Sequence, residues 1–312
     1  MVNQTDCKMQ LSKVNEVYLK LEVDSSLSRE LADYFTFEVP GAKFMPAYRN
    51  RMWDGKIRLF SEQTGKIYVG LLPYIKDYCN KNNVTINIDE GVEDVRDIVH
   101  KSVRDFIGSL RPKSKGKELE IRDYQIDAVH HALRSHRCLL LSPTASGKSL
   151  IIYSLIRYYN LLLKDKKILI LVPTTSLVEQ MYSDFIDYGW KDEYVHRIYS
   201  GYERITNKPV IVSTWQSLYK MDKKYFKDFG CVIGDEAHLF KAKSLTSILT
   251  KLDDCKYRFG LTGTLDGTQT HRLVLEGLFG SVNKVTSTKE LMDKKTLANL
   301  NIKCIVLKHT QE

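Results

Sequence analysis

The chain has 312 residues, about twice the length of a usual domain, which predicts one large domain and one smaller one. Hydrophobic residues make up 43% and charged residues 27%, a balance that excludes disordered and fibrous proteins and indicates a globular one. The net charge of +9 favours a polyanionic partner, because cations that neutralise phosphates release counterions, although solvated lysines give the same balance.

The six cysteines lie far apart, with no Cys-x-x-Cys pair and no histidine cluster at zinc-ligand spacing. This spacing excludes a zinc knuckle and a disulfide framework, and it predicts reduced thiols in the cytoplasm. The sequence has no signal peptide and no run near the roughly 20 apolar residues of a membrane span. We therefore expect a soluble, cytoplasmic protein with no membrane partner. We also expect a monomer.

Residues 1–90 contain short segments in which apolar and polar side chains alternate. One such segment runs from Val17 to Val23, and this period of two predicts strands. A helix is predicted between Leu27 and Phe35. Together these elements indicate a small α+β domain.

Cations and aromatic rings interleave between residues 44 and 58. Such a segment can bind nucleic acid, because cations contact phosphates and rings stack on exposed bases. In an alternative interpretation Phe44 and Trp53 belong to the core and the cations are its solvated flank, since alternation places Ile57 and Leu59 on one face. The candidate nucleic-acid contacts of this segment are Arg49, Arg51, Trp53, Lys56 and Arg58.

Residues 91–117 predict a helical linker. Apolar residues recur at helical spacing on one face, and we expect this face to pack against the rest of the protein. Proline, glycine and four cations follow in residues 111–117 and indicate a connection to a domain over residues 118–312. The apolar face consists of Val92, Val95, Val99, Val103 and Phe106.

From Glu118 onward, short apolar runs rich in strand-forming residues alternate with helical stretches. This rhythm predicts an α/β domain with a parallel sheet covered by helices on both faces. Ligands of such sheets bind beyond the carboxyl ends of the strands. The predicted strands are Cys138 to Leu141, Ile168 to Val172, Arg197 to Tyr199, Val210 to Val212, Cys231 to Ile233 and Tyr257 to Leu261.

The run Leu-Ser-Pro-Thr-Ala-Ser-Gly-Lys-Ser, residues 141–149, follows a predicted strand and opens a predicted helix, as a P-loop does. Its backbone N–H groups would hold the phosphates of ATP, Lys148 would reach the β- and γ-phosphates, and Ser149 would bind Mg²⁺. Ser142 stands where the general pattern has glycine, so an ordinary turn before a helix is an alternative. The candidate ATP-binding residues are Thr144, Ala145, Ser146, Gly147, Lys148 and Ser149.

Two adjacent acids end the apolar strand Cys-Val-Ile-Gly, residues 231–234. Asp235 would hold Mg²⁺, and Glu236 would orient and deprotonate the attacking water. Solvated loop charges are the alternative, but a P-loop upstream favours the catalytic interpretation. We therefore predict that Lys148, Asp235 and Glu236 are catalytic, with Ser149 and Asp235 as metal ligands.

These motifs, in this order, resemble those of the first RecA-like domain of superfamily 2 helicases. The P-loop and the Asp-Glu-Ala-His run at 235–238 carry the resemblance, together with Arg-Asp-Tyr-Gln at 122–125, which is similar to the family's adenine-recognition motif. The resemblance implies that Arg122 and Gln125 contact the base. It also implies an α/β fold and an ATP-dependent enzyme.

Three further runs carry the same resemblance. Val-Pro-Thr-Thr at 172–175 and Ser-Thr-Trp-Gln at 213–216 are similar to motifs that touch the nucleic-acid backbone, which implies such contacts for Thr174, Thr175, Ser213 and Thr214. Taken singly, Thr174 and Thr214 are better explained as turn or cap residues, and the order and spacing of the motifs reverse this judgement. The run Thr262, Gly263 and Thr264 is similar to the motif that couples hydrolysis to movement, and His238 is implied as its partner.

The whole chain is also similar to the recombination helicases of bacteriophages, which carry a small domain before the motor and a segment like Trp-Asp-Gly-Lys-Ile-Arg-Leu at 53–59. This resemblance implies branched or single-stranded DNA as partner, a role at recombination intermediates and stalled forks, and the cytoplasm of an infected host. An RNA helicase or a restriction-enzyme motor subunit is an alternative. Another alternative is a binding module with ATP as a structural ligand. The intact Glu236 argues against it, because a non-catalytic module needs no base at that position.

A complete motor of this class has a second RecA-like domain that supplies an arginine finger. No Gln-x-x-Gly-Arg-x-x-Arg segment follows Thr264, and residues 300–307 read as a strand that leads towards such a domain. We expect a fragment, or a motor completed by a separate chain. Its hydrolysis would be slow, because an arginine finger contributes about 10³ to 10⁵ in turnover.

Overall fold

The computed structural model describes residues 8–239, 242–265, 269–294, 297 and 303. The strand predicted at 300–307 lies outside this part, apart from Lys303. No helix in the described part is long and apolar enough to cross a membrane. The four described cysteines are free and buried, and they are Cys79, Cys138, Cys231 and Cys255.

The amino-terminal domain is a five-stranded sheet with two helices. Alternate side chains of its strands, such as Leu19 and Leu21, are buried, as the period of two predicts. The predicted strand and the predicted helix are both confirmed, and the helix begins where the Asp24 side chain accepts hydrogen bonds from two backbone N–H groups. The elements are β1 (Lys8–Lys13), β2 (Tyr18–Glu22), α1 (Ser25–Tyr34), β5 (Phe60–Ser61), β6 (Lys66–Tyr68), η2 (Val69–Leu71), α3 (Leu72–Asn82) and β7 (Thr85–Ile88), and the sheet order is β5-β6-β2-β1-β7.

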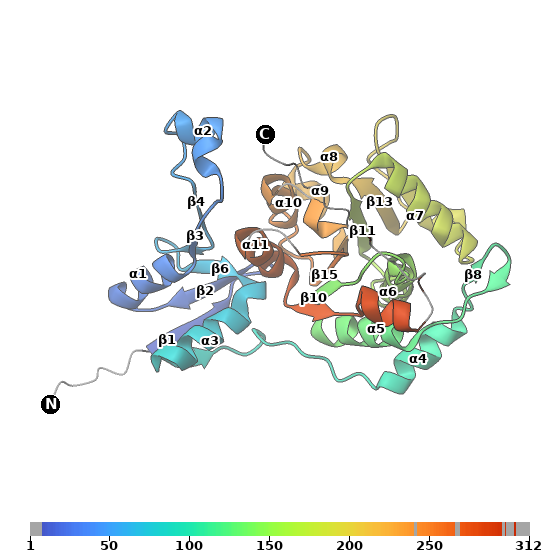
Figure 1. Ribbon diagram of the computed structural model, residues 1–312, viewed down its shortest axis with the longest axis horizontal. Coiled ribbons are helices and arrows are strands. Elements are labelled where there is room, and N and C mark those ends of the chain that lie inside the picture. The colour runs from blue at the N-terminus through green and yellow to red at the C-terminus, as the bar shows by residue number, and fades with distance from the viewer. Residues whose placement is uncertain (1–7, 240–241, 266–268, 295–296, 298–302, 304–312) are drawn as a thin grey trace, which may run out of the picture.

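A narrow arm rises from this domain and stands clear of the rest of the molecule (Figure 1). Its stem is the antiparallel pair β3 (Thr36–Glu38) and β4 (Lys56–Arg58), and its end carries η1 (Ala42–Phe44) and α2 (Pro46–Arg49). The core interpretation is wrong for Phe44, whose side chain is 68% exposed at the end of the arm. The predicted alternation is confirmed from Lys56 to Leu59, because Ile57 is half-buried and Leu59 is buried while Lys56 and Arg58 are exposed.

The helix predicted from Val92 to Phe106 begins only at His100, as α4 (His100–Ser109), so that prediction is wrong in its first half. Val95 and Val99 are exposed in an extended segment. The backbone N–H of Arg96 donates to the carbonyl of Arg134 at 2.9 Å, and this contact holds the segment in extended form. The linker ends in a hairpin of β8 (Lys113–Ser114) and β9 (Lys117–Glu118).

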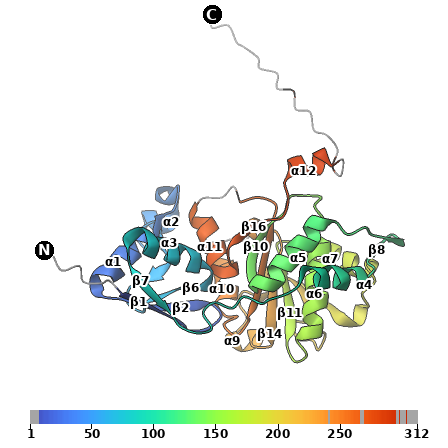
Figure 2. The same ribbon diagram turned by 90° about the horizontal axis from the view of Figure 1, so that it is seen from below.

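The large domain contains a seven-stranded parallel sheet with helices on both faces, which confirms the predicted α/β class (Figure 2). All six predicted strands are present, and the edge strand at 282–284 was not predicted. The strands are β10 (Arg137–Leu141), β11 (Lys167–Val172), β12 (Val195–Ile198), β13 (Val210–Thr214), β14 (Phe229–Gly234), β15 (Tyr257–Thr262) and β16 (Val282–Lys284), in the order β12-β13-β11-β14-β15-β10-β16.

Buried side chains on the two faces of this sheet belong to two cores. Leu139 of β10 packs in one core, and its neighbours Cys138 and Leu140 pack in the other, because successive strand side chains face opposite sides. The helices of the domain are α5 (Asp123–Ser135), α6 (Lys148–Leu162), α7 (Thr175–Asp187), η3 (Asp192–Tyr194), α8 (Trp215–Leu218), α9 (Lys223–Phe226), η4 (Ala237–Leu239), α10 (Ala242–Leu249), α11 (Gln269–Phe279) and α12 (Thr288–Asp293).

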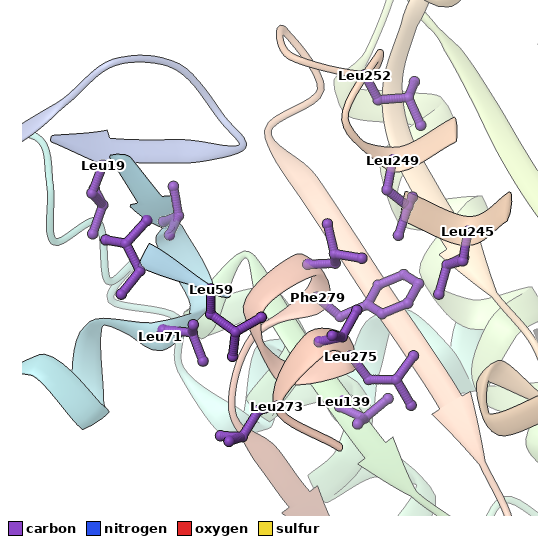
Figure 3. Packing of buried hydrophobic residues seen from close by; sticks show 14 of the residues in the cluster. Leu19, Leu59, Leu71, Leu139, Leu245, Leu249, Leu252, Leu273, Leu275 and Phe279 are labelled. Carbon is purple, nitrogen blue, oxygen red and sulfur yellow. The ribbon is translucent and has the colours of Figure 1, made fainter. Parts of the chain in front are cut away.

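The two domains pack on each other through α11, which lies between their sheets in both views (Figures 1 and 2). Leucines of the small domain, among them Leu59 and Leu71, share one core with Leu273 and Leu275 of α11 (Figure 3). The backbones approach closely, since a Cβ atom on Gly70 would lie 1.9 Å from the carbonyl oxygen of Glu276. The small domain is therefore a fixed part of this molecule.

Candidate nucleotide and nucleic-acid sites

The loop between β10 and α6 has the backbone of a phosphate-binding loop. Ala145 and Gly147 have φ angles of 66° and 80°, in the left-handed region that turns successive N–H groups towards one side. A Cβ atom on Gly147 would lie 2.3 Å from Nε2 of Gln125, so only glycine fits there. The amino end of α6 begins at Lys148, directly after this turn.

The serine that replaces the first glycine of the general pattern causes no strain. Ser142 has no positive φ, and its fully buried Oγ lies 2.6 Å from Oγ of Ser146. The left-handed positions of the loop lie further along the chain, so the pattern's first glycine is not required here.

One pocket joins the loop to the two predicted acids. Asp235 and Glu236 follow β14, and the Lys148 Nζ lies 2.9 Å from Oε1 of Glu236. Glu236 itself has a left-handed backbone, with φ of 49°, which is uncommon for a residue with a side chain. The pocket is lined by Thr144, Ala145, Gly147, Lys148, Ser149, Asp235, Glu236 and four residues of α7.

The surroundings of Asp235 suit a residue that binds a metal ion. Its side chain is 6% exposed, and Oδ1 is buried without a hydrogen-bond partner. Burial, and then the charge of Glu236, raise the pKa of Asp235 to about 6. Among the described residues no three His, Cys, Asp or Glu side chains cluster closely enough to hold a metal alone. A Mg²⁺ ion here would therefore depend on nucleotide phosphates and on Ser149 as further ligands.

The predicted coupling residues lie against this pocket. Nδ1 of His238 lies 2.6 Å from Oγ1 of Thr262, and that hydroxyl donates to the carbonyl of Thr264 at 2.7 Å. The His238 ring therefore donates through Nδ1. A Cβ atom on Gly263 would lie 3.7 Å from Nζ of Lys148, so this segment borders the P-loop.

Arg122 and Gln125 do not line the pocket. Oε1 of Gln125 accepts from the N–H of Arg122 at 3.0 Å, and its Nε2 donates to the Ser146 carbonyl at 2.9 Å. The hydroxyl of Tyr124 donates to the same carbonyl at 3.0 Å. Gln125 thus ties α5 to the P-loop, and its predicted contact with the base stays a prediction.

A second hollow of about 660 Å³ lies at the carboxyl ends of β11 and β13, and Thr174, Thr175 and Thr214 line it. Oγ1 of Thr174 accepts from the N–H of Leu177 at 3.3 Å, so this residue also caps α7. Ser213 does not line the hollow, because its side chain is fully buried and donates to the Ile198 carbonyl at 3.1 Å.

The same hollow contains residues that sequence reasoning missed. Most belong to the loop after β12, and the run Tyr-Ser-Gly-Tyr-Glu-Arg at 199–204 was a usable signal, because it joins two rings and a cation in a turn. The missed residues are Tyr199, Ser200, Gly201, Tyr202, Arg204, Gln216 and Ser217.

The arm brings together only some of the nucleic-acid contacts that were predicted in it. Arg49, Arg51 and Trp53 line one hollow at its end. Lys56 and Arg58 lie on the stem, where Arg58 pairs with Asp54 and the Lys56 carbonyl accepts from Nε1 of Trp53 at 2.8 Å.

Comparison with known proteins finds two family models that match different parts of the chain. The family model "Type III restriction enzyme, res subunit" matches residues 118–267, and the model "DNA helicase UvsW, N-terminal" matches residues 6–89. The "ATP-dependent DNA helicase uvsW" of Enterobacteria phage T4 is 35% identical over 300 residues, which are 95% of this chain and 59% of that protein. The "DNA 3'-5' translocase XPB2" of Sulfurisphaera tokodaii is 28% identical over 201 residues, which are 62% of this chain and 42% of that protein.

A solved structure extends this likeness to the fold. The crystal structure of the UvsW helicase from bacteriophage T4 superposes with a TM-score of 0.81 and 34% identity, and the match covers 89% of this chain and 99% of that one. The chain spans about six-tenths of the length of the T4 protein, at 59%. The similarity covers both the RecA-like domain and the small domain that precedes it. The chain belongs to the UvsW family of superfamily 2 helicases.

Proposed function

We propose that this protein is an ATP-driven motor that moves on DNA and acts on branched recombination and replication-fork intermediates. One observation carries the proposal: the P-loop and the Asp-Glu-Ala-His run meet in one pocket, where Lys148 and Glu236 are 2.9 Å apart. The threonine-lined hollow belongs to the same sheet edge, so a strand of nucleic acid and a nucleotide can bind to one rigid unit.

The chemistry follows from where the side chains lie. The P-loop amides and Lys148 would hold the phosphates, and Ser149 and Asp235 would hold Mg²⁺, which would neutralise charge that develops on the transferred phosphoryl group. Glu236 accepts a proton from the attacking water. Before that proton transfer, Lys148 exchanges its contact with Glu236 for the phosphates, which frees that carboxylate to act as the base.

DNA is bound at two places in this proposal. Thr174, Thr175 and Thr214 contact the backbone in the hollow, and Arg204 supplies the positive charge there. The arm adds Arg49, Arg51 and Trp53, with Lys56 and Arg58 along its stem. Residues 1–90 then form a DNA-binding domain, 91–117 a linker and 118–312 the ATP-binding domain of a monomeric, cytoplasmic enzyme.

A second RecA-like domain, in the same chain or in another, completes the site in this proposal. It would supply the arginine that stabilises the transition state. We expect the 312 residues alone to bind nucleotide and DNA but to hydrolyse ATP slowly, because such an arginine contributes about 10³ to 10⁵ in turnover.

The test is ATP hydrolysis by a protein extended through a second domain, without nucleic acid and with single-stranded DNA, a branched DNA junction or RNA. Stimulation by the junction that disappears in Glu236→Gln is the expected result. Stimulation by RNA would support an RNA helicase instead. No stimulation by any of the three would leave a binding module in which ATP is a structural ligand.

A further inference from the structure

The end of the arm exposes apolar side chains that no core covers. Phe44 is 68% exposed and Met52 is 75% exposed, and Met45 and Tyr48 between them are 42% and 41% exposed. Phe44 is the only exposed phenylalanine in the part of the chain that the structure describes. Because exposed apolar surface is unfavourable in water, a cluster of it on a projecting arm indicates a surface that a partner covers (Figure 1).

The end of the arm is folded and presents these side chains on a fixed backbone. The backbone N–H groups of Phe44 and Met52 donate to carbonyls of neighbouring turns, each at 2.9 Å. A Cβ atom on Gly55 would lie 3.1 Å from the Tyr48 ring, so the returning chain packs closely against α2. Phe44 and Met52 stay mostly outside this packing, so their truncation should leave the arm folded. A rigid surface of this kind loses little conformational entropy when it binds.

Three exposed cations accompany these apolar side chains, and none of them forms an ion pair with a described acidic residue. The Nζ of Lys43 lies 5.8 Å from the centre of the Phe44 ring, and Met52 lines one hollow with all three cations. The cations are Lys43, Arg49 and Arg51. The partner is therefore polyanionic and offers apolar faces, as nucleic acid with accessible bases does. An anionic lipid surface has both properties too, but membership in a family of DNA helicases favours DNA.

We infer that Phe44 and Met52 form an apolar wedge that enters an opened base step of branched DNA. Inserted side chains of this kind unstack the bases, and the neighbouring cations hold the phosphates on either side. Unstacking costs most in an intact duplex and least where bases are already unpaired, so the wedge favours a branch point over a linear duplex. This role rests on the proposed function, because it takes DNA as the partner. It assigns the selection of branched DNA to the arm.

The experiment measures binding of the whole 312-residue chain to a four-way DNA junction and to a linear duplex with the same number of nucleotides. The junction carries 2-aminopurine next to the branch point, and its fluorescence rises when the neighbouring base unstacks. The wild-type chain is expected to bind the junction more tightly than the duplex and to raise this fluorescence. The double change Phe44→Ala and Met52→Ala is expected to lower junction affinity about 5- to 100-fold, the range of one lost stacking contact, and to keep the affinity for the duplex.

Two further variants define the comparison. Phe44→Leu keeps an apolar side chain that can enter a base step, so it should keep the preference for the junction. Val99→Ala with Leu161→Ala is the matched control, because these side chains are 64% and 69% exposed outside the arm. The control should bind both DNAs as the wild-type chain does. The wedge variants should also keep the wild-type dependence of affinity on salt, since they lose no phosphate contact.

A junction preference that survives Phe44→Ala with Met52→Ala would overturn the inference, as would an unchanged rise in 2-aminopurine fluorescence. Equal affinity of the wild-type chain for junction and duplex would do the same. So would an equal loss of affinity for both DNAs in the double variant, because these side chains would then only maintain the arm.

The lipid alternative is tested with phosphatidylserine vesicles. Vesicle binding that requires Phe44 and Met52, with junction binding unaffected by their truncation, would assign the end of the arm to a lipid surface and overturn the wedge. A wild-type chain that binds neither DNA would instead overturn the proposed function, and the wedge with it.

Discussion

Lys148 and Glu236 form an ion pair, with Nζ 2.9 Å from Oε1, between two motifs that lie far apart in the sequence. The lysine side chain is 12% exposed and the glutamate 24%, so water screens the pair only in part. A nucleotide must take Lys148 away from this carboxylate. The pair therefore links nucleotide binding to the release of the predicted catalytic base.

Glu236→Gln is expected to tighten nucleotide binding while it abolishes hydrolysis. The variant removes the charge that competes with phosphate for Lys148, and an interaction of about 1 kcal/mol corresponds to roughly fivefold in affinity. Equilibrium binding of a fluorescent nucleotide measures the effect. Glu179→Gln serves as control, because Glu179 pairs with Arg197 outside the pocket. Weaker binding by Glu236→Gln would contradict the competition.

Acidification should weaken the contact between the two domains through His136. This residue is 6% exposed and lines the cavity between them. Burial lowers the pKa of His136 below its usual 6.5. The negative charge of Asp94 raises this pKa in part, and the positive charge of Lys256 lowers it further. The unfolded chain therefore binds a proton at a higher pH than the folded chain. The stability that His136 contributes is complete above pH 6.5 and is lost as the pH falls below that value.

Thermal unfolding at neutral pH and near pH 5.5 measures this loss, in the range where a free histidine titrates. His136→Asn should reduce the difference in Tm between the two conditions, and asparagine tolerates the φ of 58° at this position. His100→Asn changes an exposed histidine and should keep the wild-type difference. An undiminished difference in His136→Asn would assign the acid sensitivity to other groups.

Gly70→Ala should destabilise the whole chain strongly. The new Cβ would lie 1.9 Å from the Glu276 carbonyl oxygen, which is backbone of α11 and cannot move without displacing the shared core. We expect a loss of about 3 kcal/mol or more in the free energy of unfolding, measured with urea. Gly108→Ala in α4 meets open space, and it should gain about 0.5–1 kcal/mol from helix propensity. Equal stability of both variants would mean that the domains are not packed this closely.

The double change Arg49→Ala and Arg51→Ala should weaken DNA binding without affecting nucleotide binding. Two lost phosphate contacts reduce the slope of log affinity against log salt concentration by about 2. Fluorescence anisotropy of a labelled DNA junction over a salt series gives this slope. The control removes the same charge elsewhere in the domain, with Lys20→Ala and Lys81→Ala, both exposed and paired with acids. If both double variants gave the same slope, the change would reflect the net charge of the domain and not a DNA contact of the arm.

Much of the fold was predictable because strands, caps and glycine turns depend on neighbouring residues. The six predicted strands form from their own apolar runs, and the small domain's helix begins at its own cap, Asp24. The linker helix was predicted to begin too near the amino end. The helical spacing of Val95 and Val99 carries no information about the contact between Arg96 and Arg134. That contact joins residues distant in sequence, and it kept the segment extended.

The sequence by itself determined which residues meet in the candidate ATP site, since Lys148, Asp235 and Glu236 stand in local motifs whose strand ends must meet at one edge of a parallel sheet. Only the tertiary structure decided what surrounds them. Packing of α7 brings Asp184 to the pocket that Asp235 lines, and burial turns Ser213 away from the hollow that Thr214 lines. Such contacts depend on how whole helices and strands pack, and residue spacing along the chain does not encode that packing.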